Sequence, residues 1–333
     1  GPPNRLACSS VPSDPGGVRV LDPRSWLWIG FGVVVAAVLA LDLGLGRRGA
    51  RPTSVGSALK WSGLWVGLAL VFNVGVYIWQ GPEPATEFLT GFLIEKSLAI
   101  DNIFVFLVVF RYLQVPADLQ HKVLVWGVLG ALAFRALFIA AGIAMLERFH
   151  WTIYVFGVLL IVTGWKIALQ KGRQPQIERN PALRALRRVV PIADAYDGGR
   201  FVTRSQGRRV ATPLLVALVV IEASDIVFAI DSIPAILAIT RDPFIVYTSN
   251  VFAVLGLRAL YFALAGVMER FHHLHYGLAA VLVFVGLKMA LMDVVKVPVS
   301  VSLLVVAAIL GVSITASLLR PVAPEQHTAG PGT

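Results

Sequence analysis

The sequence predicts an all-α polytopic membrane protein, with about nine transmembrane helices built around two inverted three-helix repeats. Three observations lead to this fold class: the composition, the length of the apolar runs, and an internal repeat. Of the 333 residues, 57% are hydrophobic and only 14% are charged. A soluble domain cannot bury so much apolar surface, so the composition indicates a chain that lies in the lipid bilayer.

Nine apolar runs are long enough to cross a bilayer, because a spanning helix needs about 17–25 residues. They lie at 26–45, 60–79, 87–110, 123–145, 151–169, 212–239, 244–268, 276–292 and 300–319. The remaining segments are predicted to be two disordered tails, rich in Pro, Ser and Gly, and one long basic loop. The tails are residues 1–25 and 320–333, and the loop is 170–211.

The net charge of +10 does not indicate a nucleic-acid partner, because the basic residues gather in the gaps between apolar runs. The first, third and fifth gaps hold four, two and ten Lys or Arg residues, whereas the second holds none and the fourth holds one. This alternation predicts a multi-pass plasma membrane protein with its N-terminus outside and its C-terminus in the cytoplasm. For the basic cytoplasmic loop, a plain solvated linker is favoured over a membrane-surface or regulatory segment.

Four short motifs recur in the same order along the chain. LAIDN (98–102) matches FAIDS (228–232), and FRALF (134–138) matches LRALY (257–261). LERFH (146–150) then matches MERFH (268–272), and GWKIAL (164–169) matches GLKMAL (286–291). The copies cover three spans each, 87–169 and 212–292, after two leading spans in 26–80. An odd number of spans inverts the second copy, which is a transporter architecture, although a repeated structural hairpin is the alternative.

Carboxylates occur inside the apolar runs, where an ionised side chain costs roughly 2.5–3.5 kcal/mol at the bilayer centre. Facing lipid, all of them together would cost more than a typical protein gains by folding. They must therefore face one another, water or a cation, and such residues mark an ion or proton pathway by default. They are Asp42, Glu95, Asp101, Glu222, Asp225 and Asp231.

Helical spacing divides these acids between two faces. Glu95 and Asn102 share one face, and Asp225 and Ser232 share the equivalent face of the second copy. Asp101 and Asp231 lie about 120° away from those faces, so a straight helix would not aim both sets at one point. Pro234 predicts a local unwinding of the helix, because proline leaves a backbone carbonyl without its helical donor. Such unwinding would allow both sets of side chains to point at one site.

The predicted metal site is formed by Asp101 and Asn102 from one copy and by Asp231 and Ser232 from the other. Glu95, Glu222 and Asp225 would add ligands or carry protons, and Asp42 belongs to the cation pathway. Because every donor is an oxygen atom, the site suits a hard divalent cation such as Mn²⁺, Mg²⁺ or Ca²⁺. The cation would be transported, so no permanent cofactor is expected.

Two arginines, Arg135 and Arg258, occupy matching mid-span positions of the copies. They are interpreted either as structural partners that neutralise nearby carboxylates, or as competitors of the cation during transport. Lys96 has Glu95 and Asp42 as candidate partners.

The quoted motifs resemble a known family. GFLIEKSLAIDNIFVFLVVF and EASDIVFAIDSIPAI closely resemble the two signatures of the TerC family of integral membrane proteins, and ALDLG (40–44) and WGVLGALAFRALFIAAG (126–142) fit the same pattern. The resemblance covers about residues 40–292. It implies tellurium resistance, Mn²⁺ export and a fold grouped with the LysE-type exporters. The family's acidic positions correspond to Asp42, Glu95, Asp101, Asn102, Glu222, Asp225, Asp231 and Ser232.

The sequence leaves three functions to compare. The first is a secondary exporter of Mn²⁺ in exchange for protons, and no P-loop is present to provide ATP drive. The second is a non-transporting membrane scaffold of a tellurite or envelope-stress resistance complex. The third, a membrane enzyme, is disfavoured because no nucleophile–His–acid arrangement or HExxH motif is present. Homo-oligomerisation and resistance-complex partners both stay open.

Overall fold

The computed structural model describes residues 23–46, 55–169, 181–193, 195–205, 208–264 and 274–319. The chain divides into two compact units, Gly1–Gly44 and Leu45–Thr333. Helix α1 (Pro23–Gly46) makes up the described part of the first unit and contains Asp42. The predicted tails lie almost entirely outside the described residues, so their disorder stays a prediction.

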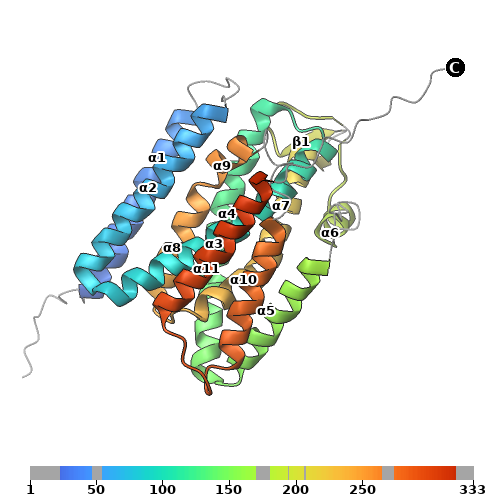
Figure 1. The fold of residues 1–333 in the computed structure, drawn as a ribbon. Coiled ribbons are helices and arrows are strands. Elements are labelled where there is room, and N and C mark those ends of the chain that lie inside the picture. The colour runs from blue at the N-terminus through green and yellow to red at the C-terminus, as the bar shows by residue number, and fades with distance from the viewer. Residues whose placement is uncertain are drawn as a thin grey trace, which may run out of the picture. The chain divides into compact units, whose positions relative to one another are not determined.

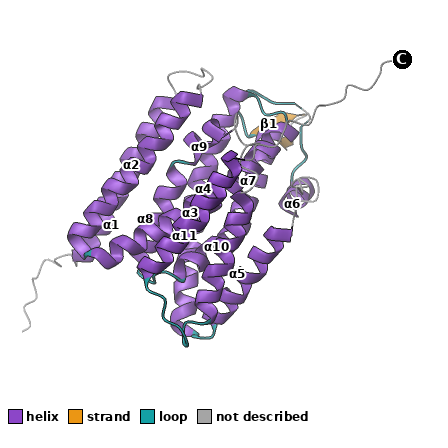
Figure 2. Ribbon diagram, in the orientation of Figure 1, coloured by secondary structure: helices purple, strands orange, loops and turns teal. Residues whose placement is uncertain are grey.

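The second unit is built from helices and one β-hairpin (Figures 1 and 2). Before the hairpin come α2 (Val55–Gln80), α3 (Pro82–Tyr112), α4 (Ala117–Arg148), α5 (Thr152–Leu169) and α6 (Pro181–Val189). The hairpin pairs β1 (Val202–Ser205) with β2 (Arg208–Ala211) in antiparallel register. After it come α7 (Pro213–Leu237), α8 (Pro243–Leu255), α9 (Leu257–Leu264), α10 (Leu274–Ala290) and α11 (Val299–Leu319).

Local sequence signals set several helix boundaries. Proline occupies the first turn of α3, α7 and α8, where its fixed φ fits and its missing N–H is not needed. Asp242 caps α8 by accepting a hydrogen bond from the Phe244 backbone N–H at 2.8 Å. The sharp turn from α2 into α3 passes through Gly81, whose φ of 96° disfavours any residue with a Cβ.

The described helices confirm an all-α membrane protein. Six candidate spans are long and apolar enough to cross a bilayer: Gly56–Gln80, Ala117–Arg148, Thr152–Leu169, Pro213–Leu237, Pro243–Ala263 and Val299–Ser317. Large apolar side chains on their surfaces are exposed, as lipid-facing residues would be, including Val71, Ile78, Leu304 and Val312. Helix α3 coincides with a predicted span but carries many charged residues. A total of nine crossings therefore stays a prediction.

The two sequence copies pack against each other reciprocally. The first copy forms α3, α4 and α5, and the second forms α7, the α8–α9 pair and α10. Helix α3 packs on α8 while α4 packs on α7, and α5 lies along α10 (Figure 1). Side chains of both copies, among them Ile94, Leu160, Leu237 and Val285, fill one apolar core. The copies therefore form one folded body rather than two.

Glycine allows α5 and α10 to approach closely. A Cβ atom on Gly164 would lie 2.7 Å from the Ala279 carbonyl oxygen, and one on Gly286 would lie 2.7 Å from the Gly157 carbonyl oxygen. Real Cβ atoms do not come so near to backbone oxygen, so these positions exclude larger residues unless the helices separate.

Two expectations about local structure are wrong. The backbones of α3 and α7 are helical through Asp101 and Asp231, because Pro234 lies in the last turn of α7, where a lost hydrogen bond changes little. The helix break occurs instead at Gly256, between α8 and α9. The basic loop is also no plain linker, since its described part folds into α6 and the hairpin.

Candidate functional site

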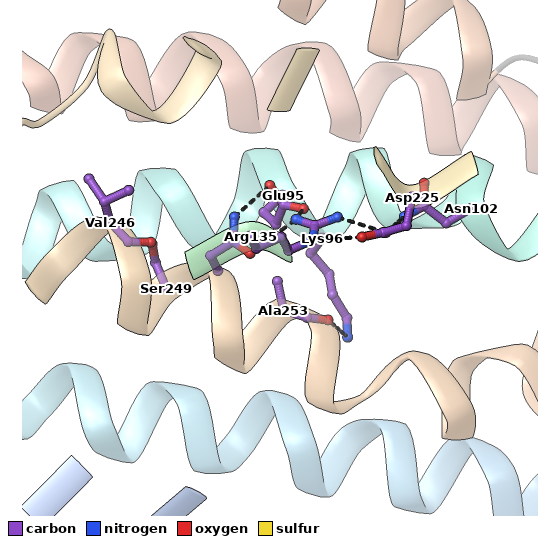
Figure 3. A network of polar contacts seen from close by, with 9 residues as sticks. Glu95, Lys96, Asn102, Arg135, Asp225, Val246, Ser249 and Ala253 are labelled. Atoms are coloured by element: carbon purple, nitrogen blue, oxygen red, sulfur yellow. Dashed lines mark hydrogen bonds and ion pairs between the residues drawn. The ribbon is translucent and has the colours of Figure 1, made fainter. Parts of the chain in front are cut away.

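A buried arginine lies at the centre of the polar network in the helical body (Figure 3). Arg135 on α4 is only 1% exposed. Its Nη1 donates to Glu95 Oε1 on α3 and, at 3.0 Å, to Asn250 Oδ1 on α8. Its Nη2 lies 3.2 Å from Asp225 Oδ1 on α7, and its Nε lies 3.4 Å from Asp225 Oδ2. One guanidinium therefore joins four helices.

Two amide side chains complete this network. Asn102 Nδ2 donates to Asp225 Oδ1 at 3.0 Å, and Asn250 Nδ2 donates to Glu95 Oε2 at 3.2 Å. Glu95 and Asn102 are seven residues apart on α3, so both project from one face of that helix. We call this group the Arg135 cluster; its members are Glu95, Asn102, Arg135, Asp225 and Asn250, all at most 3% exposed.

The charges of the cluster do not cancel when its acids are ionised. Glu95 and Asp225 occupy equivalent positions in the two copies, and both are ion-paired to the single Arg135 guanidinium. Two carboxylates and one guanidinium leave one net negative charge in an interior of low dielectric constant. Such charge is stable only when paired, hydrogen-bonded or balanced by a further cation.

Three oxygen atoms near the cluster in sequence are buried without a hydrogen-bond partner among the described residues. They are Asn102 Oδ1, Glu222 Oε2 and Ser232 Oγ. Glu222 lies one helical turn before Asp225, and its carboxylate occupies the space beside the α4 backbone that a side chain at Gly130 would fill. Buried polar atoms are normally satisfied, so these oxygens are suited to receive water, a proton or a cation.

Of the remaining predicted ligands, Asp231 is the one whose side chain the structure describes. Asp231 is half-buried on α7 and accepts a hydrogen bond from Thr163 Oγ1 on α5 at 3.0 Å. Asp101 lies on α3 and Asp42 on α1, but their side chains are outside the described ones. In the part of the chain that is described, no group of three or more His, Cys, Asp or Glu residues is arranged to hold a metal ion.

Two other basic residues make contacts that the sequence did not predict. Arg258 on α9 places Nη1 3.0 Å from His121 Nδ1 on α4. Lys96 does not bind its neighbour Glu95, because consecutive helical residues point about 100° apart. Its ammonium instead donates to the Ala253 carbonyl at 3.2 Å, near the end of α8 (Figure 3).

Asn250 and Gly130 are site residues that sequence reasoning missed. An uncharged amide or a glycine costs far less than a carboxylate inside an apolar run, so neither stands out there by its energetic cost. Asn250 nevertheless stands in the apolar stretch 244–255, where an amide needs a hydrogen-bond partner. That requirement is the signal that could have identified it.

Over most of its length, the chain resembles one family of membrane proteins and several individual bacterial proteins. Residues 80–325 match the family described as "Integral membrane protein TerC family". The chain is 57% identical over 294 residues to the "Uncharacterized membrane protein STKORF319" of Myxococcus xanthus, covering 88% of this chain and 92% of that protein. It is 50% identical over 293 residues to the "Putative membrane-bound redox modulator Alx" of Escherichia coli K12, covering 85% and 91%. No solved structure matches.

Proposed function

Because the chain belongs to the TerC family of integral membrane proteins, we propose that it is a secondary transporter that exports a divalent cation. The proposed cation is Mn²⁺, and protons are the proposed exchange partner. The proposed location is the plasma membrane, with the N-terminus outside and the C-terminus in the cytoplasm. No permanent cofactor and no catalysed reaction are part of the proposal.

The observation that carries the proposal is a set of buried oxygen atoms, at Asn102, Glu222 and Ser232, that have no hydrogen-bond partner within the described part of the chain. They accompany the ionisable pair Glu95 and Asp225 inside a membrane-spanning body. Carboxylate, amide and hydroxyl oxygens are the ligands of hard divalent cations. Mn²⁺ rather than Mg²⁺ or Ca²⁺ is chosen on the family resemblance.

In the proposed cycle, Arg135 and the cation compete for the same carboxylates. With Arg135 paired to Glu95 and Asp225, as observed, neither acid is free to bind metal. Cation entry would require the guanidinium to withdraw, and protonation of the acids would later release the cation, because a protonated carboxylate is a poor ligand. The two copies, taken as inverted repeats, would expose this region to each side in turn.

The Arg135 cluster also favours a second candidate, a non-transporting membrane scaffold. A scaffold predicts that buried acids serve as structural ion pairs, and Arg135 pairs with two of them. Relatives bear the name "redox modulator", but this chain has a single cysteine and cannot form an internal disulfide. Tellurite is an anion, so an acidic site does not bind it and any tellurium phenotype would be indirect.

Mn²⁺ flux into liposomes that carry the purified protein tests the proposal. An imposed pH gradient should drive flux in the unaltered protein and in a Glu147→Gln control, whose side chain is exposed at the end of α4. Glu222→Gln should abolish flux while the protein still folds. No flux from folded, unaltered protein would favour the scaffold.

A further inference from the structure

The segment that contains the β-hairpin is fixed to the ends of membrane helices. Tyr196 donates its hydroxyl to the Leu113 carbonyl at the end of α3, at 2.7 Å. Lys122 near the start of α4 donates to the Gly199 carbonyl and places its ammonium 5.0 Å from the centre of the Phe201 ring. Strand β2 then continues into α7 after a single residue.

The surroundings of the hairpin place it at the level of the lipid headgroups. Trp126, one turn along α4 from Lys122, is 52% exposed and meets Phe201 edge-on at a ring distance of 6.4 Å. Tryptophans with one exposed edge are typical of membrane–water interfaces. Because β2 precedes a membrane-spanning helix directly, the hairpin lies at that boundary and not far out in solvent.

Two arginines of the hairpin face each other across the strands. The register pairs Arg204 of β1 with Arg209 of β2. Directly opposite residues project from the same face with Cβ atoms about 4.5–5.5 Å apart, and like charges there repel. Both side chains are exposed, and neither makes an ion pair within the described residues. The described acid of this segment, Asp197, bonds to Thr203 and Arg200 instead.

Further arginines extend this basic surface. Arg208 follows on β2, and Arg187 and Arg188 lie on α6; all three are exposed. Helix α6 buries Leu183 and packs on α7, so its charged side faces outward. None of these three makes an ion pair in the part of the chain that is described. The segment therefore gathers five exposed guanidinium groups that have no acidic partner among the residues that the structure describes.

We propose that the hairpin is a binding site for anionic phospholipid, with Arg204 and Arg209 holding the headgroup phosphate. Two adjacent guanidinium groups can grip one phosphate through several charge-assisted hydrogen bonds. The phosphate removes the repulsion across the strands. The occupant is a lipid headgroup rather than a soluble anion, because the hairpin lies at the depth of the headgroups. Arg187, Arg188 and Arg208 would in addition be attracted to the negatively charged surface of the bilayer.

Native mass spectrometry of the full chain in detergent micelles, titrated with phosphatidylglycerol or phosphatidylcholine, tests this site. The protein should retain phosphatidylglycerol in preference to phosphatidylcholine. The double variant Arg204→Gln with Arg209→Gln should bind it about 30-fold more weakly, as expected for two lost surface arginines. The control, Arg148→Gln with Arg241→Gln, removes the same charge at the opposite ends of α4 and α7 and should bind normally.

Several results would overturn the proposal. Equal retention of both lipids, or equal loss in the control, would show that no specific headgroup site exists. Displacement by glycerol 3-phosphate at the concentration of the lipid, or by an oligonucleotide, would assign the site to a soluble anion or to nucleic acid. Arg204→Lys with Arg209→Lys keeps the charge and guards against misfolding. This variant should bind phosphatidylglycerol with intermediate affinity. Full affinity would show that charge alone is enough and that hydrogen bonds from the guanidinium groups to the phosphate are not required.

Discussion

The two copies of the repeat treat their equivalent arginines differently. Arg135 lies within the unbroken helix α4 and is buried among the carboxylates of both copies. Arg258 lies on the short helix α9, after the break at Gly256, and contacts His121 near the start of α4. Equivalent sequence therefore does not ensure that two side chains have equivalent surroundings.

The largest effect is expected from removing the buried guanidinium. Arg135→Met should lower the free energy of unfolding by about 3–5 kcal/mol, because it leaves Glu95 and Asp225 buried without their cation. Arg258→Met should cost less, because Arg258 is only partly buried and more of its charge is solvated. SDS-induced unfolding of the purified variants in detergent micelles measures both. Equal losses would mean that the two arginines are equivalent after all.

Gly130 should matter more than its neighbour one turn earlier on α4. A Cβ at Gly130 would overlap the Glu222 carboxylate, whereas one at Gly127 would make an ordinary contact with Ile221 at 3.4 Å. If the protein transports Mn²⁺ as proposed, Gly130→Ala should slow flux by about 10- to 100-fold, since displaced ligands lose their geometry. Gly127→Ala is the matched control. Undisturbed flux in Gly130→Ala would remove Glu222 from the pathway.

The break itself can be tested by exchanging residue types between the copies. A Cβ on Gly256 would lie 2.8 Å from Lys96 Nζ and 3.1 Å from Trp65 Cβ. Gly256→Ala should therefore cost about 1–3 kcal/mol of stability through overpacking. At the equivalent position of α4, Ala133→Gly should cost about 1 kcal/mol, from helix propensity alone. Thermal unfolding of the two variants would show whether the glycine is required or merely tolerated.

The smallest effect should lie outside both copies, in the basic segment. The Thr203 hydroxyl, and secondarily Arg200, hold the pKa of Asp197 below its ordinary value. A lowered folded-state pKa means that this carboxylate stabilises the hairpin at pH values above its ordinary pKa, and that the contribution disappears as the pH falls through the folded value. Hydrogen exchange of hairpin amides, compared with Asp197→Asn, should show a difference at neutral pH that vanishes in acid.

Sequence predicted the helical membrane class and the pairing of Arg135 with carboxylates. These follow from apolar run length and from the cost of buried charge, which are properties of the chain itself. The predicted position of the helix break was wrong. Proline is a strong helix breaker, but Pro234 lies in the last turn of α7. The break lies at Gly256 instead, where a Cβ atom would crowd Trp65 and Lys96.

The sequence predicted the part of the site that depends on spacing within a single helix. Glu95 and Asn102 share a face because seven-residue spacing holds on a straight helix, and Asp225 of α7 contacts Asn102 there. Asp231 was assigned to the same point only by assuming unwinding, and it lies against Thr163 instead. Asn250 belongs to a helix whose packing on α3 no local pattern reveals. Contacts that depend on which helix becomes a neighbour remain beyond single-sequence reasoning.

The glycine contacts between α5 and α10 have one further consequence. Gly164 meets the Ala279 backbone, and the equivalent Gly286 meets the Gly157 backbone, so each copy offers the other the same surface. This is the reciprocity of a two-fold dimer interface. Here α5 and α10 belong to one polypeptide. Their effective concentration is therefore set by the length of chain that joins them and not by the concentration of the protein in the membrane. Dilution in the membrane, which separates an ordinary dimer, leaves this contact intact.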